Sequence, residues 1–233
     1  MVDIAVNLQK VQGRITRAAE RVLRDAGEIT LVAVTKTHPP EVIDAAYELG
    51  LRHFGENRVE EAANKVGGLP KDIVWHMVGH LQSRKAALAV DLFEVVHSVD
   101  SVKLARRLDR LCAERERTMP VLLEVNVSGE ASKYGFSVAN RDALETSVGE
   151  ILSMSHIRIE GLMTMAPIVA DPEDVRPVFR GLRELRDALV ARFPQIEWRH
   201  LSMGMTDDFE VAIEEGATIV RIGRAIFGPR GTR

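Results

Sequence analysis

The 233-residue sequence predicts a parallel α/β fold, and within that class a closed (β/α)8 TIM barrel with an extra N-terminal helix. Short apolar stretches rich in β-branched residues alternate with longer amphipathic stretches, and we count eight such β-then-α units after residue 27. No Gly/Ser/Pro-rich linker divides the chain. We therefore predict a single domain over 1–233, with 1–27 as the N-terminal helix. An open doubly wound sheet is the alternative.

The first helix is predicted over residues 3–26, where apolar residues recur at helical spacing up to Asp25-Ala26-Gly27. The first strand follows at 30–35, because Leu31 to Val34 form a β-branched apolar run too short for a helix. Pro39 and Pro40 fit only a turn or a first helical turn, so the next helix spans 40–49 and Gly50 caps it.

The same alternation predicts the remaining seven units. They are strand 52–54 with helix 57–66, strand 73–78 with helix 82–89, strand 92–96 with helix 101–116, strand 120–126 with helix 140–152, strand 157–162 with helix 172–192, strand 197–201 with helix 207–215, and strand 218–222 with a short helix after Arg224.

Composition narrows the class of protein. Thirty-one basic and 34 acidic residues give a net charge of -3 without long runs of one sign, which argues against an electrostatic nucleic-acid or membrane binder. No apolar run reaches membrane-spanning length, and the N-terminus has an acid where a signal peptide carries bases, so we expect a cytoplasmic protein. The single cysteine, Cys112, excludes an internal disulfide and any cysteine-based structural zinc site.

In a barrel the carboxyl ends of all strands meet at one face, where such folds place their chemistry. Lys36 stands at the end of the first strand. Partial desolvation there favours the neutral amine, which is the nucleophile of Schiff-base chemistry. A snorkelling surface lysine is the alternative.

Two glycine-containing loops follow the last two strands, at Ser202 to Thr206 and at Arg221 to Arg224. Gly204 and Gly223 allow close backbone approach, while the Ser202 hydroxyl and the amides at the two helix starts can bind phosphate oxygens. Barrels commonly bind phosphate between these loops. The alternative is two ordinary turns.

Arg221 shares a strand face with Ile219, so the arginine either points into the barrel, where it needs a partner, or lies on the solvated outer face. His76 and His80 are four residues apart but span a strand end and lack an evident third ligand, so we predict hydrogen bonding and no metal. Arg84 and Lys85 are interpreted as a solvated helix face.

The chain resembles, along nearly its whole length, the YggS/PROSC family of pyridoxal 5'-phosphate (PLP) homeostasis proteins. The matching segments are Ala33-Val34-Thr35-Lys36, Phe54-Gly55-Glu56-Asn57, Trp75 to Ser83, Val125 to Glu130 with Lys133 and Gly135, Gly161 to Met165, Ser202 to Met205, and Val220 to Gly223 with Ile226-Phe227-Gly228.

This resemblance implies a barrel similar to the N-terminal domain of alanine racemase, with PLP as cofactor. Lys36 would carry PLP as a Schiff base, Asn57 and His80 would lie near the ring, and Arg221 would face the pyridine nitrogen. The phosphate would be held by Ser202, Gly204 and Gly223. Arg224 stands where many relatives have a small hydroxyl residue, so only its backbone contact carries over. Arg84 replaces an asparagine that is common in relatives.

A cation at the pyridine nitrogen disfavours its protonation and weakens the ring as an electron sink. Racemisation also needs an acid/base on each face of the substrate carbon. We therefore predict a protein that buffers PLP and hands it to PLP-accepting apo-enzymes, supporting vitamin B6 and amino-acid homeostasis without efficient catalysis, as a monomer. The alternatives are a PLP-dependent amino-acid racemase using Tyr134 or His80 as second base, and a cofactor-free Schiff-base aldolase.

Overall fold

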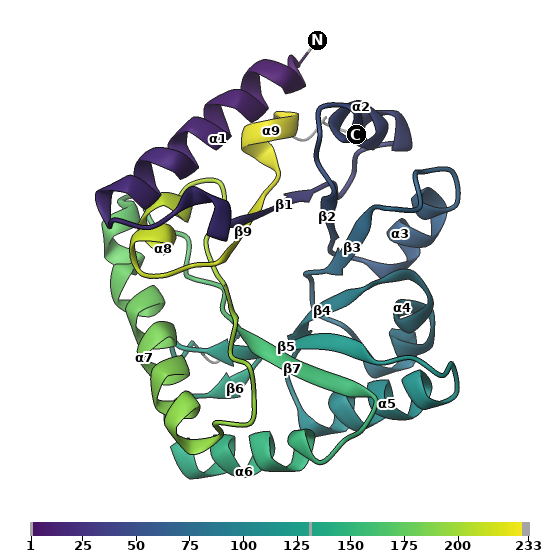
Figure 1. The fold of residues 1–233 in the computed structure, drawn as a ribbon, viewed down its shortest axis with the longest axis vertical. Coiled ribbons are helices and arrows are strands. Elements are labelled where there is room, and N and C mark those ends of the chain that lie inside the picture. The colour runs from purple at the N-terminus through teal and green to yellow at the C-terminus, as the bar shows by residue number, and fades with distance from the viewer. Residues whose placement is uncertain (1, 131, 230–233) are drawn as a thin grey trace.

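The computed structural model describes residues 2–130 and 132–229. Its strands form one sheet in the order β4-β3-β2-β1-β9-β8-β7-β5-β6, and β4 also pairs with β5, so the sheet closes into an eight-stranded ring with β6 outside it. All strand pairs are parallel. Viewed along the barrel, the strands surround the centre and the helices lie outside them (Figure 1). The predicted (β/α)8 barrel is confirmed, and the open doubly wound sheet is wrong.

The strands are β1 (Thr30–Val34), β2 (His53–Glu56), β3 (Val74–Met77), β4 (Val95–Val99), β5 (Met119–Asn126), β6 (Phe136–Ser137), β7 (Ile157–Met163), β8 (His200–Ser202) and β9 (Ile219–Ile222). The α-helices are α1 (Ile4–Arg21), α2 (Pro40–Glu48), α3 (Val59–Val66), α4 (Ala86–Leu92), α5 (Val102–Ala113), α6 (Arg141–Leu152), α7 (Arg176–Arg192), α8 (Phe209–Glu214) and α9 (Arg224–Phe227). Short 3₁₀ turns are η1 (Ala26–Glu28), η2 (Ser83–Lys85) and η3 (Pro172–Val175).

Local residue chemistry explains several element ends. Pro40 occupies the first turn of α2, where its missing N–H is not needed. Gly50 has a φ of 94°, and its N–H donates to the Tyr47 carbonyl at 2.8 Å, which confirms the predicted glycine cap. Helix α1 stops earlier than predicted, at Arg21, because the backbone turns left-handed at Leu23 with a φ of 56°.

The fourth strand lies three residues later than predicted, at Val95–Val99 instead of 92–96. Leu92 is the last residue of α4, and the Phe93 N–H still donates to Ala89 at 3.0 Å. Both residues are apolar, so the sequence pattern could not separate the helix end from the strand. The shift moves His97 into the barrel strand.

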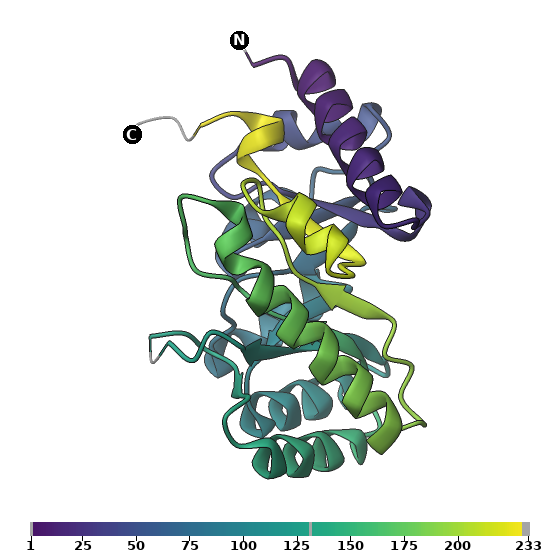
Figure 2. The same cartoon turned by 90° about the vertical axis from the view of Figure 1, so that its left-hand side faces the viewer.

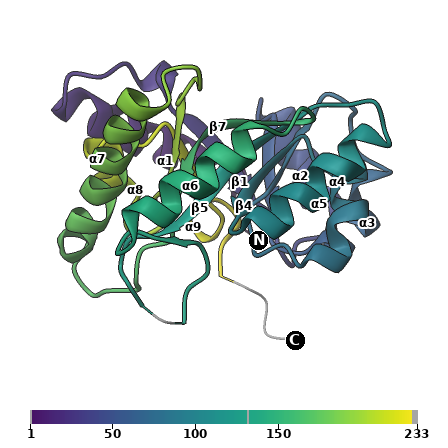
Figure 3. The same ribbon diagram turned by 90° about the horizontal axis from the view of Figure 1, so that it is seen from below.

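Side chains fill the barrel interior, as in other barrels of this class. An inner apolar cluster comes from residues in the strands and, at Val78, directly after one: Val32, Val34, Val78, Leu122, Met163 and Ile219. A second, larger cluster lies between the strands and the surrounding helices. Helices α3, α4 and α5 lie on one side of the barrel and α7 and α8 on the other (Figure 3).

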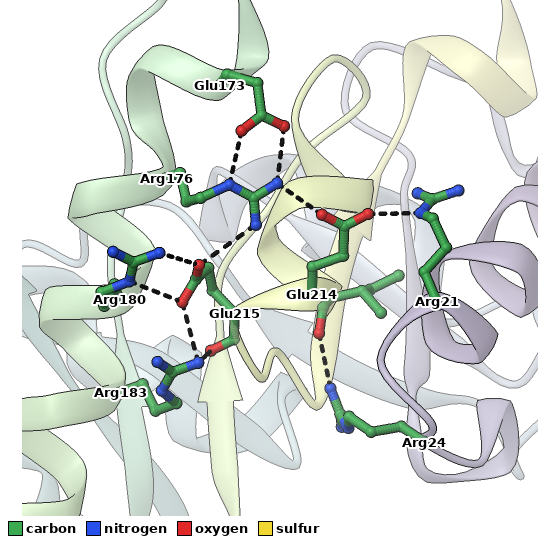
Figure 4. A network of polar contacts seen from close by, with 9 residues as sticks. Arg21, Arg24, Glu173, Arg176, Arg180, Arg183, Glu214 and Glu215 are labelled. Atoms are coloured by element: carbon green, nitrogen blue, oxygen red, sulfur yellow. Dashed lines mark hydrogen bonds and ion pairs between the residues drawn. The ribbon is translucent and has the colours of Figure 1, made fainter.

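Helix α1 packs across α8 and α9 at the outside of the barrel (Figure 2). Ion pairs reinforce this contact and that between α7 and α8 (Figure 4). Glu214 bonds Arg21 and Arg176, both at 2.6 Å. Glu215, which is 4% exposed, contacts Arg176 at 3.3 Å, Arg180 at 3.0 Å and Arg183 at 3.0 Å. These pairs connect the N-terminal helix to the last third of the barrel.

Within residues 2–130 and 132–229, no helix has both the length and the apolar character needed to cross a membrane.

Candidate functional site

Lys36 follows β1 at the carboxyl-end face of the barrel. The side chains of Val32 and Val34 belong to the inner cluster, and the N–H of Thr35 donates to the Gly55 carbonyl at 3.0 Å, so strand pairing continues to residue 35. The same alternation directs Lys36 toward the interior side. Its side chain is partly buried. The structure therefore places Lys36 at the mouth of the barrel.

A buried ion pair holds the backbone before Lys36. The Thr35 hydroxyl donates to Glu56 Oε1 at 2.7 Å, and Lys65 Nζ donates to the same oxygen at 2.8 Å and to the Thr35 carbonyl at 2.9 Å. Thr35 and Glu56 are both 0% exposed. Burial raises the pKa of Glu56, although the Lys65 and Thr35 hydrogen bonds oppose this. The sequence reasoning missed this pair.

The backbone after Lys36 is held by helix α3. Thr37 has a φ of 67°, an unusual conformation for a β-branched residue. Its N–H donates to Glu61, and Lys65 Nζ lies 2.7 Å from the same carboxylate. Glu61 and Lys65 stand four residues apart on α3, a spacing that predicts an ion pair on a helix and could have identified them from the sequence. Lys36 thus lies between two fixed backbone segments.

Arg221 points into the barrel, as one of the two sequence interpretations predicted. It is 5% exposed, with Nη1 donating to the Ser202 carbonyl at 2.7 Å and to Ser202 Oγ at 2.5 Å, and Nη2 donating to the Thr164 carbonyl at 2.9 Å. Burial lowers the pKa of Arg221 to about 10, opposed by Asp208 and Glu124. A guanidinium has five N–H donors. Three are used in these bonds, and the other two have no acceptor within residues 2–130 and 132–229, which leaves them for a ligand.

Ser202 is completely buried, and its hydroxyl is close to two side chains. Oγ accepts from Arg221 and lies 2.9 Å from His97 Nδ1. His97 was missed because the predicted fourth strand ended at residue 96. The predicted contact of Ser202 with phosphate stays a prediction.

The two loops predicted to hold phosphate lie side by side. Gly204 has a φ of 92°, and a Cβ there would come within 2.6 Å of Ala212 Cβ. A Cβ on Gly223 would lie 2.8 Å from the Val34 carbonyl oxygen. The Arg221 N–H donates to the Gly204 carbonyl at 3.0 Å, which joins the loops. Both positions therefore require glycine.

Arg224 opens α9 with an exposed side chain that pairs with Asp207. Its guanidinium is thus bound at the surface. The amides of Arg224 and Ala225 begin the helix and have no acceptor inside it. They are the backbone donors that a phosphate could use, in line with a backbone contact at this position.

Asn57 follows β2 and is partly buried. Gly79, after β3, packs directly on its backbone, since a Cβ on Gly79 would lie 2.4 Å from the Asn57 carbonyl oxygen. The two strand ends are therefore in contact.

His80 and His76 have different surroundings. His80 stacks on Tyr134 with ring centroids 3.7 Å apart, and its Nδ1 lies 3.2 Å from Asp100. His76 is buried between the imidazoles of His53 and His97. No group of three or more potential metal ligands occurs in the described part of the chain.

Glu124 is a site residue that the sequence reasoning did not single out. It lies on β5 and is 6% exposed, and its Oε2 has no hydrogen-bond partner among the described residues. Burial raises the pKa of Glu124 to about 7; Asp100 raises it further and Arg221 opposes the rise. Its inward position on β5 is the sequence feature that could have identified it.

The comparisons place this barrel in a known class. The family model described as "Alanine racemase, N-terminal domain" matches residues 6–231. This agrees with the closed barrel.

Individual relatives define the family more narrowly. The pyridoxal phosphate homeostasis protein of Aquifex aeolicus is 43% identical over 224 residues, covering 96% of each chain. That of Escherichia coli K12 is 40% identical over 238 residues, covering 99% of this chain and 98% of the relative. The structure of PipY from Synechococcus elongatus with PLP bound has a TM-score of 0.85 at 35% identity, covering 97% of this chain and all of that one. The chain belongs to the family of pyridoxal phosphate homeostasis proteins, which confirms the resemblance drawn from its motifs.

Proposed function

We propose that this protein binds PLP at the carboxyl-end face of its barrel and buffers and delivers it. The observation that carries the proposal is Arg221, a buried guanidinium on β9, the strand paired with the one that leads into Lys36; two of its N–H donors have no acceptor among the described residues. A pyridine nitrogen is an acceptor that suits such a donor. The close relatives named for PLP homeostasis, and PipY with PLP bound, support this reading.

Most of the residues that the sequence pointed to have a proposed contact with PLP. Lys36 carries PLP by condensing its amine with the aldehyde, with loss of water, to form a Schiff base. Asn57 and His80 border the ring. The backbone at Gly223 and Arg224 receives the phosphate, because the first amides of α9 lack intrahelical acceptors, and the backbone of Gly204 in the neighbouring loop adds to this contact.

The chemistry of the site favours storage over turnover. A bound PLP supplies an electrophilic aldehyde and a ring that can accept electrons when its nitrogen is protonated. The Arg221 cation disfavours that protonation. We therefore propose binding and transfer to apo-enzymes without efficient catalysis.

The test is the visible absorption of the purified protein and of Lys36→Ala, before and after addition of PLP and borohydride. We expect a Schiff-base band in wild type that borohydride converts to a stable pyridoxyl-lysine, and no band in the variant. Absence of the band in wild type with excess PLP would refute the proposal and favour a cofactor-free aldolase.

One observation favours a second candidate, a PLP-dependent racemase. His80, stacked on Tyr134 and paired with Asp100, would be the second acid/base beside Lys36 in such an enzyme. Turnover of L- to D-amino acids by the PLP-loaded protein, lost in His80→Gln, would establish the enzyme. Absence of turnover in wild type supports the carrier.

We further propose one domain that acts as a cytoplasmic monomer. Light scattering during gel filtration measures the oligomeric state, and fractionation of cells measures the compartment.

A further inference from the structure

Three histidines form a line of hydrogen bonds through the barrel interior. It begins at His53, the first residue of β2, whose Nδ1 lies 3.0 Å from His76 Nε2. His76 Nδ1 lies 2.9 Å from His97 Nε2, and His97 Nδ1 lies 2.9 Å from Ser202 Oγ. His76 is 3% exposed, and His97 and Ser202 are 0% exposed. The line ends at Arg221, whose Nη1 donates to the serine oxygen at 2.5 Å.

We infer the direction of the bonds in this line from the hydrogen of the Ser202 hydroxyl. A guanidinium can only donate, so Ser202 Oγ accepts from Arg221 and has a single hydrogen of its own to give. Oγ has a second lone pair, so the direction depends on where this buried hydrogen finds an acceptor, and among the described residues His97 Nδ1 is the side-chain atom within hydrogen-bond distance to take it. His97 then has its proton on Nε2 and donates to His76 Nδ1. By the same rule His76 donates from Nε2 to His53 Nδ1.

This direction requires neutral imidazoles, and the surroundings favour them. Burial holds the pKa of His97 well below its ordinary value, and His76, Arg221 and His200 lower it further. Burial, together with His53 and His200, lowers the pKa of His76 to about 3. The pKa of His53 is also lowered by burial.

We propose that His53, His76 and His97 are positioning residues for Arg221, forming a one-directional relay that keeps the Ser202 oxygen turned toward the guanidinium. The relay thereby holds the two remaining N–H groups of Arg221 toward the ring nitrogen of a bound ligand. This last step rests on the proposed PLP function, whereas the direction of the relay does not.

The relay also gives Ser202 a different role from the one its motif implied. Its oxygen accepts from Arg221 and its hydrogen goes to His97. In this relay Ser202 affects the ring end of the ligand, through Arg221.

The direction of the relay can be measured without any substitution. Long-range ¹H–¹⁵N spectra of the PLP-free protein at pH 7 report which ring nitrogen of each histidine is protonated. We expect His53, His76 and His97 to be neutral with the proton on Nε2. A charged ring, or a proton on Nδ1 of His76 or His97, would overturn the relay. His156, whose side chain is 42% exposed, serves as the solvent-exposed reference.

The positioning role is tested with His97→Leu, which removes both ring nitrogens, and with His156→Leu as the control. Affinities for PLP and for pyridoxal, which lacks the phosphate, are measured from absorption titrations. We expect His97→Leu to weaken both by about tenfold, the loss of one hydrogen bond that involves a charged group. An unchanged affinity, or a loss confined to PLP, would overturn the proposal.

If His97→Leu does not fold, Ser202→Ala provides the same comparison, because it removes only the hydroxyl. Equal losses for PLP and pyridoxal support action through Arg221, and a loss for PLP alone contradicts it. Failure of wild type to bind PLP at all would refute the proposed function and the ligand step, while the nitrogen spectra still decide the direction of the relay.

Discussion

The carboxyl group of Glu124 should make the stability of the PLP-free protein depend on pH in a predictable way. Its pKa rises from an ordinary value of 4.5 to about 7, chiefly because the group is buried, and neighbouring Asp100 adds to the rise. Between these two values the folded state holds a proton that the unfolded state has lost. Folding stability attributable to Glu124 is therefore fully present below the unfolded value, falls as pH rises toward 7, and does not fall further above it.

The perturbation is Glu124→Gln, which keeps the size of the side chain and cannot ionise. At about 1.4 kcal/mol for each pH unit, the shift predicts that wild type loses about 3 kcal/mol relative to the variant between pH 4.5 and pH 7. Urea unfolding of both proteins at a series of pH values from 4.5 to 8 measures this difference, and any constant offset from burying the amide cancels.

Glu20→Gln, on the exposed face of α1, is the matched control and should differ from wild type by less than about 0.5 kcal/mol at every pH. A difference between wild type and Glu124→Gln that stays constant across the range would refute the reasoning. So would a difference of the opposite sign, since that requires a lowered pKa.

Two further substitutions test the ion pairs of Glu215 and the contact between Gly79 and Asn57. Glu215→Gln should destabilise the protein by about 2 kcal/mol, because three arginines lose a buried charged acceptor (Figure 4). The control is Asp187→Asn, which alters an exposed ion pair and should cost less than about 0.5 kcal/mol. Urea unfolding measures both free energies. The arginine hydrogen bonds outweigh burial and lower the pKa of Glu215. The stability that Glu215 contributes is therefore present above the pKa of the unfolded state and is lost as pH falls through the pKa of the folded state. A destabilisation by Glu215→Gln that grows toward acid pH would contradict this reasoning. Gly79→Ala should displace Asn57, because the new Cβ would lie 2.4 Å from the Asn57 carbonyl oxygen, and should weaken PLP binding about tenfold. The control Gly67→Ala, which has open space around it, should leave the PLP titration unchanged. Equal PLP affinities for Gly79→Ala and wild type would show that the strand ends at residues 57 and 79 are not coupled.

Much of this fold follows from the order of residues alone. Short apolar strands alternate with amphipathic helices, and parallel strands joined in this way close into a barrel whose strand ends face one side. Pro39 and Pro40 mark the start of α2, and Gly50 marks its end, because these residues restrict or relax the backbone wherever they occur. Local rules of this kind were enough to place Lys36 at the barrel mouth and to limit Arg221 to two orientations.

The remaining features needed the tertiary structure, because they depend on which strands meet when the sheet closes. The run of apolar residues at the end of α4 concealed the start of β4, and with it His97, whose partners Ser202 and His76 come from other strands. The carboxylate that holds Thr37 comes from α3, and the surroundings of Glu124 come from strands far away in the sequence. The sequence by itself determined the barrel and the residues at its strand ends, since these follow from local periodicity. Only the closed barrel decided their hydrogen-bond partners and charges, since burial and long-range contacts exist only after closure.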